Sequence, residues 1–160
     1  MTDSRPRARL AAVHLDEATL PRVSADADHE RAVAIFDLVE ENVFSVVGRD
    51  DGPYALTIAQ QEGKLAFVAR NEEDETVAEF IVSMTPFRPL LKDYFLVCET
   101  YYAAIRTASP RQIEAIDRER TKLHNEGAEL MGARISDKVE IDKITARRLF
   151  TLISALHWKS

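Results

Sequence analysis

The stretch YALTIAQQEGKLAFVARNEEDETVAEFIVSM, residues 54–84, decides the fold class of this chain. Apolar and polar side chains alternate through 54–60 and again through 64–70, which is typical of half-buried strands. The Glu-Gly pair at 62–63 separates these segments and predicts a hairpin. A third strand is predicted at 76–84, after a short charged loop. Three consecutive strands with short connections predict an antiparallel meander.

The segment that precedes the meander predicts one further strand and one helix. RLAAVHLD, residues 9–16, alternates in the same way, and we expect it to join the sheet at one edge. A helix is predicted over 29–42, because apolar residues recur there at spacings of three and four. Asp26 or Asp28 is the expected N-cap, since a carboxylate accepts hydrogen bonds from the first free amides of a helix.

The segment that follows the meander predicts three helices. The first covers 85–107 and carries the widest apolar stripe, so we expect it at the centre of the fold. The second covers 109–133 and begins with the capping-box pattern of Ser109 and Gln112. At 25 residues it would be roughly 37 Å long, so its far end is expected to project or to pair with another chain. Asp142 is the expected cap of the last helix.

These elements predict an α+β fold in which an antiparallel sheet of three to five strands packs against about four helices. The chain has 160 residues, which suits one domain, and we assign that domain to residues 9–160. Residues 1–8 are polar and carry two arginines and a proline, so they are predicted to form a disordered tail.

Composition limits the classes of function. Hydrophobic residues make up 46% of the chain and the formal net charge is −6, which disfavours general affinity for nucleic acids or anionic membranes. No apolar run approaches the roughly 20 residues that span a bilayer, and the polar N-terminus is not a secretory signal. Cys98 is the single cysteine, so no intrachain disulfide can form, and we expect a cytoplasmic protein.

One polar edge on the second helix is the main candidate site. Asp117, Arg120 and His124 are spaced by three and four residues, so they lie together along one edge of the apolar face. Two readings stay open. Arg120 and Asp117 can form an ion pair that only fixes packing, or Arg120 can bind a small anion with His124 as donor or proton shuttle. Asn125 and Glu126, next to His124, point elsewhere.

Other chemical signals are weaker. Gly127 in a helix interior costs about 1 kcal/mol relative to alanine, which a close helix contact, an approaching ligand or no special role would each allow. Trp158 belongs either to a docked C-terminal helix or to a partner interface that it anchors. The four histidines show no metal-site spacing, so no metal and no cofactor are predicted. Cys98 lies in an apolar stripe, as a structural thiol does. Arg147 and Arg148, with Lys143, form a small basic face near the C-terminus. Residues 106–122 carry five basic against three acidic side chains, which is not a nucleic-acid stripe.

Five stretches together resemble one known family: DHERAVAIFDLVEEN (28–42), GPYALTI (52–58), MTPFRPLLKDYFLVCETYYAAIR (84–106), QIEAIDRERTKLHNEGAEL (112–130) and ARRLFTLISALHW (146–158). In their order and amino-acid sequence they are similar to the uncharacterised protein family (UPF) 0262, small bacterial proteins found chiefly in alphaproteobacteria. The resemblance covers roughly residues 9–158. It implies a cytosolic bacterial protein, and it implies no reaction, cofactor or catalytic residue.

The leading functional hypothesis is therefore a non-catalytic protein that binds a protein partner, including a second copy of itself. It rests on the lack of a catalytic signature, on the long second helix and on Trp158. The alternative is an enzyme or sensor for a small anionic metabolite that uses Arg120 and His124, with Asp117 as the orienting group. Nucleic-acid binding through Arg147, Arg148 and the basic tail is a third hypothesis, which the net charge disfavours.

Overall fold

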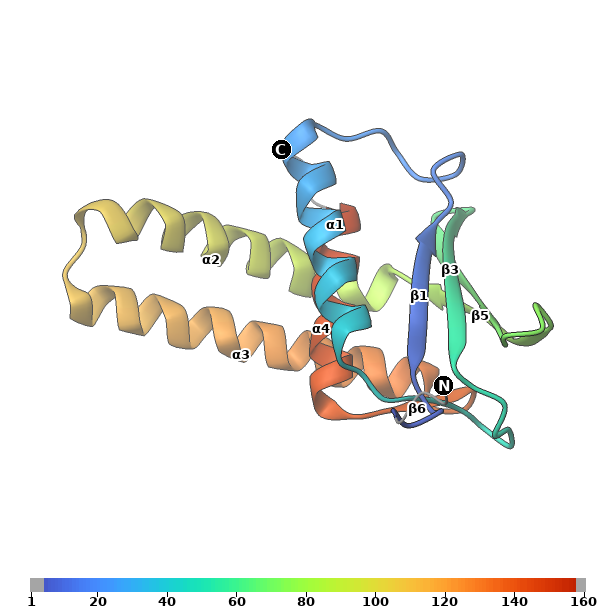
Figure 1. Cartoon of the computed structure of the whole chain (residues 1–160). Helices are drawn as coiled ribbons and strands as arrows, with labels where there is room; N and C mark the ends of the chain where they lie inside the picture. The colour runs from blue at the N-terminus through green and yellow to red at the C-terminus, as the bar shows by residue number, and fades with distance from the viewer. Residues whose placement is uncertain (1–4, 158–160) are drawn as a thin grey trace.

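The computed structural model describes residues 5–157 and has one four-stranded sheet whose helices all lie on the same side (Figure 1). The sheet contains β1 (Leu10–Leu15), β3 (Tyr54–Gln61), β4 (Lys64–Arg70) and β5 (Thr76–Ser83). Its spatial order is β1-β3-β4-β5. The predicted α+β class and the edge position of the first strand are confirmed.

The prediction of a purely antiparallel sheet is wrong, because β1 pairs with β3 in parallel. The other two pairings, β3 with β4 and β4 with β5, are antiparallel as the meander predicts. The parallel pair follows from α1 (Ala25–Glu40), which lies between β1 and β3 in the chain and carries it back to the starting edge. Parallel neighbours need such a crossover, whereas the meander strands need only tight turns.

A second, two-stranded sheet pairs β2 (Phe44–Val46) with β6 (Val139–Ile141) in antiparallel fashion. The sequence does not predict it, because each strand has three residues and periodicity needs a longer segment. Phe44 and Val46 are buried, and so is Val139. This sheet ties the segment after α1 to the segment before the last helix, and it thereby fixes where that helix begins.

Three helices follow the meander: α2 (Arg88–Thr107), α3 (Pro110–Ile135) and α4 (Lys143–His157). A single 3-10 turn, Thr85–Phe87, precedes α2. The predicted capping box of α3 is confirmed, since Ser109 and Gln112 each bond the other's backbone amide. The predicted cap of α4 is confirmed as well, because Asp142 accepts a hydrogen bond from the Thr145 amide at 2.9 Å.

The predicted start of α1 is wrong. The helix begins at Ala25, and Ser24 is its N-cap, with its hydroxyl accepting from the Ala27 amide at 3.2 Å. Asp26 and Asp28 lie in the first helical turn instead, where a negative charge interacts favourably with the positive end of the helix dipole. The predicted cap residues therefore stabilise the helix end in another way.

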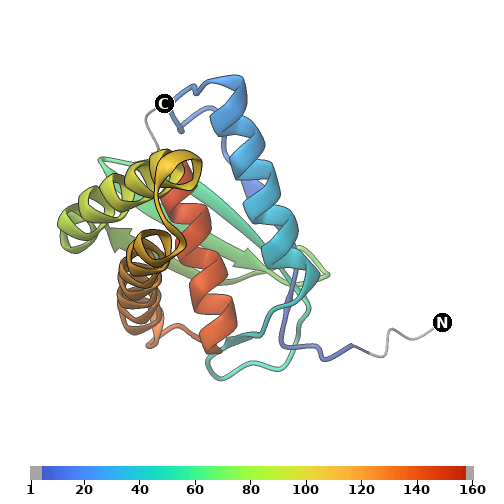
Figure 2. The same cartoon turned by 90° about the vertical axis from the view of Figure 1, so that its left-hand side faces the viewer.

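The core lies between the sheet and the helices. Buried side chains of β3 and β4 face it, including Leu56, Ile58 and Phe67. Helix α4 is at the centre of the helical layer, with α1 on one side and α2 and α3 on the other (Figure 2). This corrects the expectation that α2 is the central buried helix. Leu149, Phe150, Leu152 and Ile153 of α4 are almost fully buried.

Helices α2 and α3 form an antiparallel hairpin whose tip extends well beyond the sheet and α4 (Figure 1). The expected projection of the long helix is thus confirmed. Three large apolar side chains of α2 are exposed, namely Leu96, Tyr102 and Ile105.

The ordered contacts begin ahead of residue 9. Arg7 donates a hydrogen bond from Nε to the Gly52 carbonyl at 3.1 Å, and the Ala8 carbonyl accepts one from the Phe44 amide at 2.9 Å. Residues 1–4 of the predicted tail, and Trp158, lie outside the described residues.

Candidate functional site

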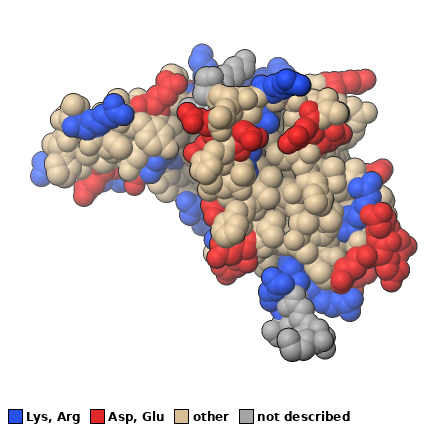
Figure 3. Space-filling view, turned by 45° about the horizontal axis from the view of Figure 1, so that its top comes forward, with Lys and Arg blue, Asp and Glu red and all other residues tan. Residues whose placement is uncertain are grey.

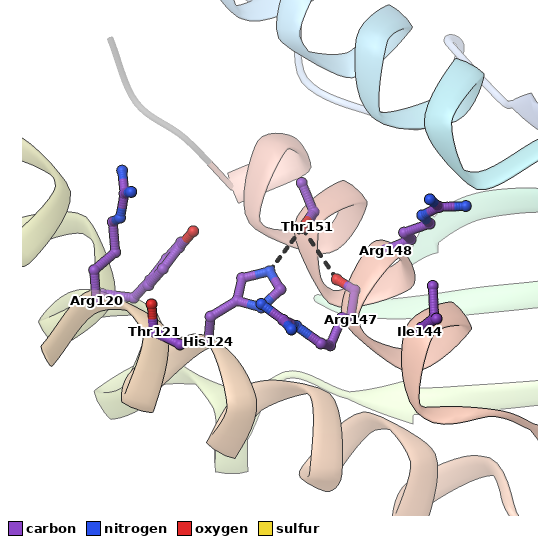
Figure 4. A pocket seen from close by; sticks show the side chains of 8 residues that line it. Arg120, Thr121, His124, Ile144, Arg147, Arg148 and Thr151 are labelled. Carbon is purple, nitrogen blue, oxygen red and sulfur yellow. Dashed lines mark hydrogen bonds between the residues drawn. The ribbon is translucent and has the colours of Figure 1, made fainter. Parts of the chain in front are cut away.

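The candidate site is a cavity of about 440 Å³ at the base of the projecting hairpin, where α3 faces α4 (Figure 4). Helices α3 and α4 contribute most of the lining, and α2 contributes one residue. The residues that line the cavity are Tyr94, Arg120, Thr121, His124, Ile144, Arg147, Arg148 and Thr151. None of these is acidic, and three are arginines, in a chain whose net charge is −6.

Gly127 sets the distance between α3 and α4 at this place. A Cβ built on Gly127 would lie 2.3 Å from the ring of Phe150, which is fully buried in α4. A side chain at this position would force the buried Phe150 ring to move, which is costly in a closely packed core. Of the readings left open for Gly127, the structure has the close helix contact, and this contact brings His124 within reach of α4.

Asp117 and Arg120 form the ion pair that the sequence predicts, with Arg120 Nη2 donating to Asp117 Oδ1. The guanidinium also lies over the Tyr101 ring, 3.8 Å from its centroid, as a cation–π contact. His124 makes no hydrogen bond to either residue. The predicted trio is thus an ion pair with a histidine one turn away. Arg120 and His124 do not contact each other through a hydrogen bond, and they share only the lining of the cavity.

His124 is bonded to α4 instead. Its Nε2 lies 2.7 Å from Thr151 Oγ, and Thr151 Oγ lies 3.0 Å from the Arg147 carbonyl oxygen (Figure 4). Because the single hydroxyl proton of Thr151 goes to that carbonyl, Nε2 carries the hydrogen of the shorter contact. Nδ1 is then an acceptor, and it is buried without a partner among the described residues.

The imidazole of His124 is held neutral. Burial is the largest cause that lowers its pKa, and the positive charges of Arg147 and Arg120 add to it, so that its pKa is about 4. The ring also packs against Tyr94 and Phe150, with centroid distances of 5.7 and 5.4 Å. At neutral pH the positive charge of the cavity therefore comes from its arginines.

The three arginines are not equivalent. Arg148 points away from His124 and donates from Nη1 to the Glu41 carbonyl at 2.6 Å (Figure 4). Arg120 already has Asp117 as its partner. Arg147 reaches towards the imidazole, and its side chain has no hydrogen bond or ion pair to any described residue. Arg147 is therefore the cavity arginine whose donors are available to a ligand.

Sequence reasoning did not place Arg147, Arg148 and Thr151 at this site. They belong to α4, more than 20 residues from His124, and only the packing of α4 on α3 brings them there. The signal that could have found them is Gly127, because it indicates which turn of α3 contacts another helix.

Asp51 and Cys98 lie in structural environments. Asp51 accepts hydrogen bonds from Arg49, Tyr54 and Asn71 at one end of the sheet, and these bonds lower the pKa of its carboxyl. Burial raises the pKa of the Cys98 thiol, which makes it a poor nucleophile at neutral pH.

The wider surface shows no extended basic field on the face seen in Figure 3, where both signs of charge are mixed on the projecting hairpin. Acidic side chains gather at the right-hand edge, near the loops at that end of the sheet. Over residues 5–157, no three His, Cys, Asp or Glu side chains come together as a metal site. Within that same range, none of the helices is both long and apolar enough to cross a membrane.

Comparison with known proteins identifies a family without an assigned activity. The model of "Uncharacterised protein family (UPF0262)" matches residues 7–159. A UPF0262 protein of Hyphomonas neptunium is 56% identical over 93% of this chain and 92% of its own length. One of Xanthobacter autotrophicus is 56% identical over 98% of this chain and 96% of its own.

A third relative, a UPF0262 protein of Azorhizobium caulinodans, is 55% identical over 99% of both chains. No solved structure matches this chain. The resemblance noted from the sequence is confirmed by these matches, which cover nearly the whole chain in each case. The chain belongs to the uncharacterised protein family UPF0262.

Proposed function

We propose that this protein is a non-catalytic, cytosolic binder of a small anionic metabolite, which it holds in the cavity between α3 and α4. The observation that carries the proposal is the unpaired guanidinium of Arg147 in a cavity that no described carboxylate lines. An anion there gains charge-assisted hydrogen bonds, which are stronger than neutral ones. Arg120 adds positive charge from the opposite wall, although Asp117 compensates part of it.

His124, which is hydrogen-bonded to Thr151, would help to orient the ligand. The acceptor Nδ1 has no partner, so a ligand that carries a hydroxyl or a protonated phosphoryl oxygen would satisfy it. A bound anion next to the ring would also raise the low pKa of His124, because an opposite charge favours the protonated form. Anion binding is therefore expected to strengthen as the pH falls below neutral.

The Thr151–His124 pair resembles a nucleophile and its base, but three features argue against catalysis. A base with a pKa of about 4 accepts a proton poorly at neutral pH. Within residues 5–157, no group orients the imidazole through Nδ1, as the third member of a catalytic triad does. The hydroxyl proton of Thr151 is already engaged by the Arg147 carbonyl. We therefore favour binding over turnover.

A thermal-shift screen against small phosphates and carboxylates tests this function. A ligand at 100 times its dissociation constant stabilises the native state by about 2.7 kcal/mol, which raises the melting temperature by roughly 5–10 °C for a domain of this size. Arg147→Ala should remove that shift.

Arg111→Ala is the matched control, because it removes the same charge from an exposed site at the tip of the hairpin. A ligand that stabilises wild type and Arg147→Ala equally would place the binding elsewhere. The absence of any stabilising anion would favour the second candidate below.

Self-association through the projecting hairpin is that second candidate, and it retains the leading hypothesis from the sequence. It is favoured by the exposed apolar side chains Leu96, Tyr102 and Ile105, which lie on a hairpin that extends beyond the body. Size-exclusion chromatography with light scattering tests it, with Ile105→Glu compared with Val47→Glu, an exposed apolar position outside the hairpin. A strict monomer at high micromolar concentration excludes this candidate.

A further inference from the structure

Arg31 of α1 is a buried cation without a counter-ion among the described residues. Its side chain is almost inaccessible, with a relative exposure of 6%. One hydrogen bond is present, a long contact of 3.3 Å from Nη2 to the Leu156 carbonyl near the end of α4. Nε has no partner, and Arg31 forms no ion pair with any described residue.

This arrangement needs an explanation, because a buried charge is costly unless it is paired and hydrogen-bonded. A guanidinium has five N–H donors in a planar fork, and the Leu156 carbonyl accounts for one of them. The negative end of the α4 dipole compensates part of the charge, and it leaves Nε unsatisfied. A compact anion that meets the fork would supply such a partner.

A cavity of about 510 Å³ lies beside Arg31, under the connection between β1 and α1. Its lining is largely polar, with Glu17, Arg22 and Asp28 beside Arg31, and its apolar part is formed by Ala18, Leu20, Pro21 and Val23. It shares no lining residue with the cavity between α3 and α4. The two cavities can therefore be tested separately.

We propose that this cavity binds a short aliphatic monocarboxylate, with the carboxylate on Arg31 and the aliphatic part against Leu20, Pro21 and Val23. A carboxylate matches the guanidinium fork in two parallel hydrogen bonds. Glu17 and Asp28 would repel a dianion such as phosphate more strongly than a monoanion. The proposal goes beyond the anion site of Arg147 and does not depend on it.

The test is an NMR titration of the full chain with sodium butyrate, read at the Nε–Hε signal of Arg31. We expect a saturable shift with a millimolar dissociation constant, as suits so small a ligand. Acetate should bind about tenfold more weakly, since each buried methylene contributes roughly three- to fourfold in affinity. Phosphate should leave this signal in place.

Two variants assign the contact. Arg31→Lys keeps the charge and loses the fork, so butyrate affinity should fall at least tenfold. Arg22→Gln changes an exposed arginine of the same cavity and should alter the affinity less than threefold.

An Arg31 signal that butyrate does not move, or that sodium chloride at equal ionic strength moves as far, would overturn the proposal. So would a loss of affinity in Arg22→Gln alone. These results come from the wild-type chain and from Arg22→Gln, so they hold even if Arg31→Lys fails to fold.

Discussion

The two halves of α3 belong to one helix and have opposite environments. From Leu123 to Ile135 the helix packs on α4, and five of its residues are buried: Leu123, Gly127, Ala128, Met131 and Ile135. From Pro110 to Lys122 no residue is buried. The cavity residues Arg120, Thr121 and His124 lie where the two halves meet.

This difference separates stability from binding. The packed half sets the register of α3 on α4 and hence the position of His124 relative to Arg147. The projecting half is held through its contact with α2 and through surface pairs such as Asp117–Arg120, which contribute little to the free energy of unfolding. Substitutions in the two halves should therefore have effects of very different size.

The largest difference is expected between Met131→Ala and Ile116→Ala. Met131 is fully buried in the packed half, so its truncation should lower the free energy of unfolding by about 2–5 kcal/mol. Ile116 is only partly buried in the projecting half, so the same truncation should cost less than about 1 kcal/mol. Urea denaturation measures both values, and equal losses would refute the distinction between the two halves.

The next largest effect tests the helix contact itself. Gly127→Ala forces a methyl group against the Phe150 ring, and we expect a net loss of about 1–3 kcal/mol from overpacking. Gly132→Ala is the matched control in the same helix, because a Cβ there meets nothing within 4 Å. It should stabilise the protein by up to about 1 kcal/mol through helix propensity. A stabilising Gly127→Ala would show that the contact is loose.

A smaller effect is expected from the pH dependence of His124. Its pKa is about 4 in the folded protein and about 6.5 when unfolded. Between these values the unfolded chain binds a proton that the folded chain does not, so stability falls as the pH drops from 6.5 towards 4. His124→Gln should reduce this loss by roughly 1–2 kcal/mol, a value discounted for the partial exposure of the ring.

The control for this experiment is the window above pH 7, where both states of His124 are neutral and the variant should show no extra slope. Burial also lowers the pKa of His157. The His124→Gln variant therefore still loses some stability as the pH falls. If the free energies of unfolding of wild type and His124→Gln change in parallel from pH 7 to pH 4, this result would contradict the low pKa of His124.

The smallest effect is expected from Asp117→Asn. It removes the ion pair with Arg120 in the projecting half, where both side chains are partly exposed. Pairs spaced by three residues on a helix contribute about 0.2–0.5 kcal/mol. The melting temperature should hardly change, while the freed Arg120 should bind anions somewhat more tightly. A large loss of stability would mean that the projecting half depends on this pair.

Local signals predicted the caps of α3 and α4 but not the cap of α1. The capping box of Ser109 and Gln112 and the cap at Asp142 depend on residues three or four apart, and both are present. The parallel pairing of β1 with β3 and the sheet of β2 with β6 depend on partners far apart in the chain, and periodicity carries no information about such pairing.

The same limit applies to the site. Helical spacing brought Asp117, Arg120 and His124 to one edge of α3, whereas Thr151 and Arg147 reach His124 only through the tertiary contact of Gly127 with Phe150.

Anion binding at Arg147 is best measured by an NMR titration of the full chain with inorganic phosphate at pH 6. We predict saturable shifts of the Arg147 Nε–Hε signal and of the His124 imidazole, with the Arg111 signal unchanged. The His124 pKa should rise at the same time, because the bound anion favours the protonated ring. If Arg147 and Arg111 respond alike, or if the His124 pKa stays at its value without phosphate, then the cavity between α3 and α4 is not an anion site.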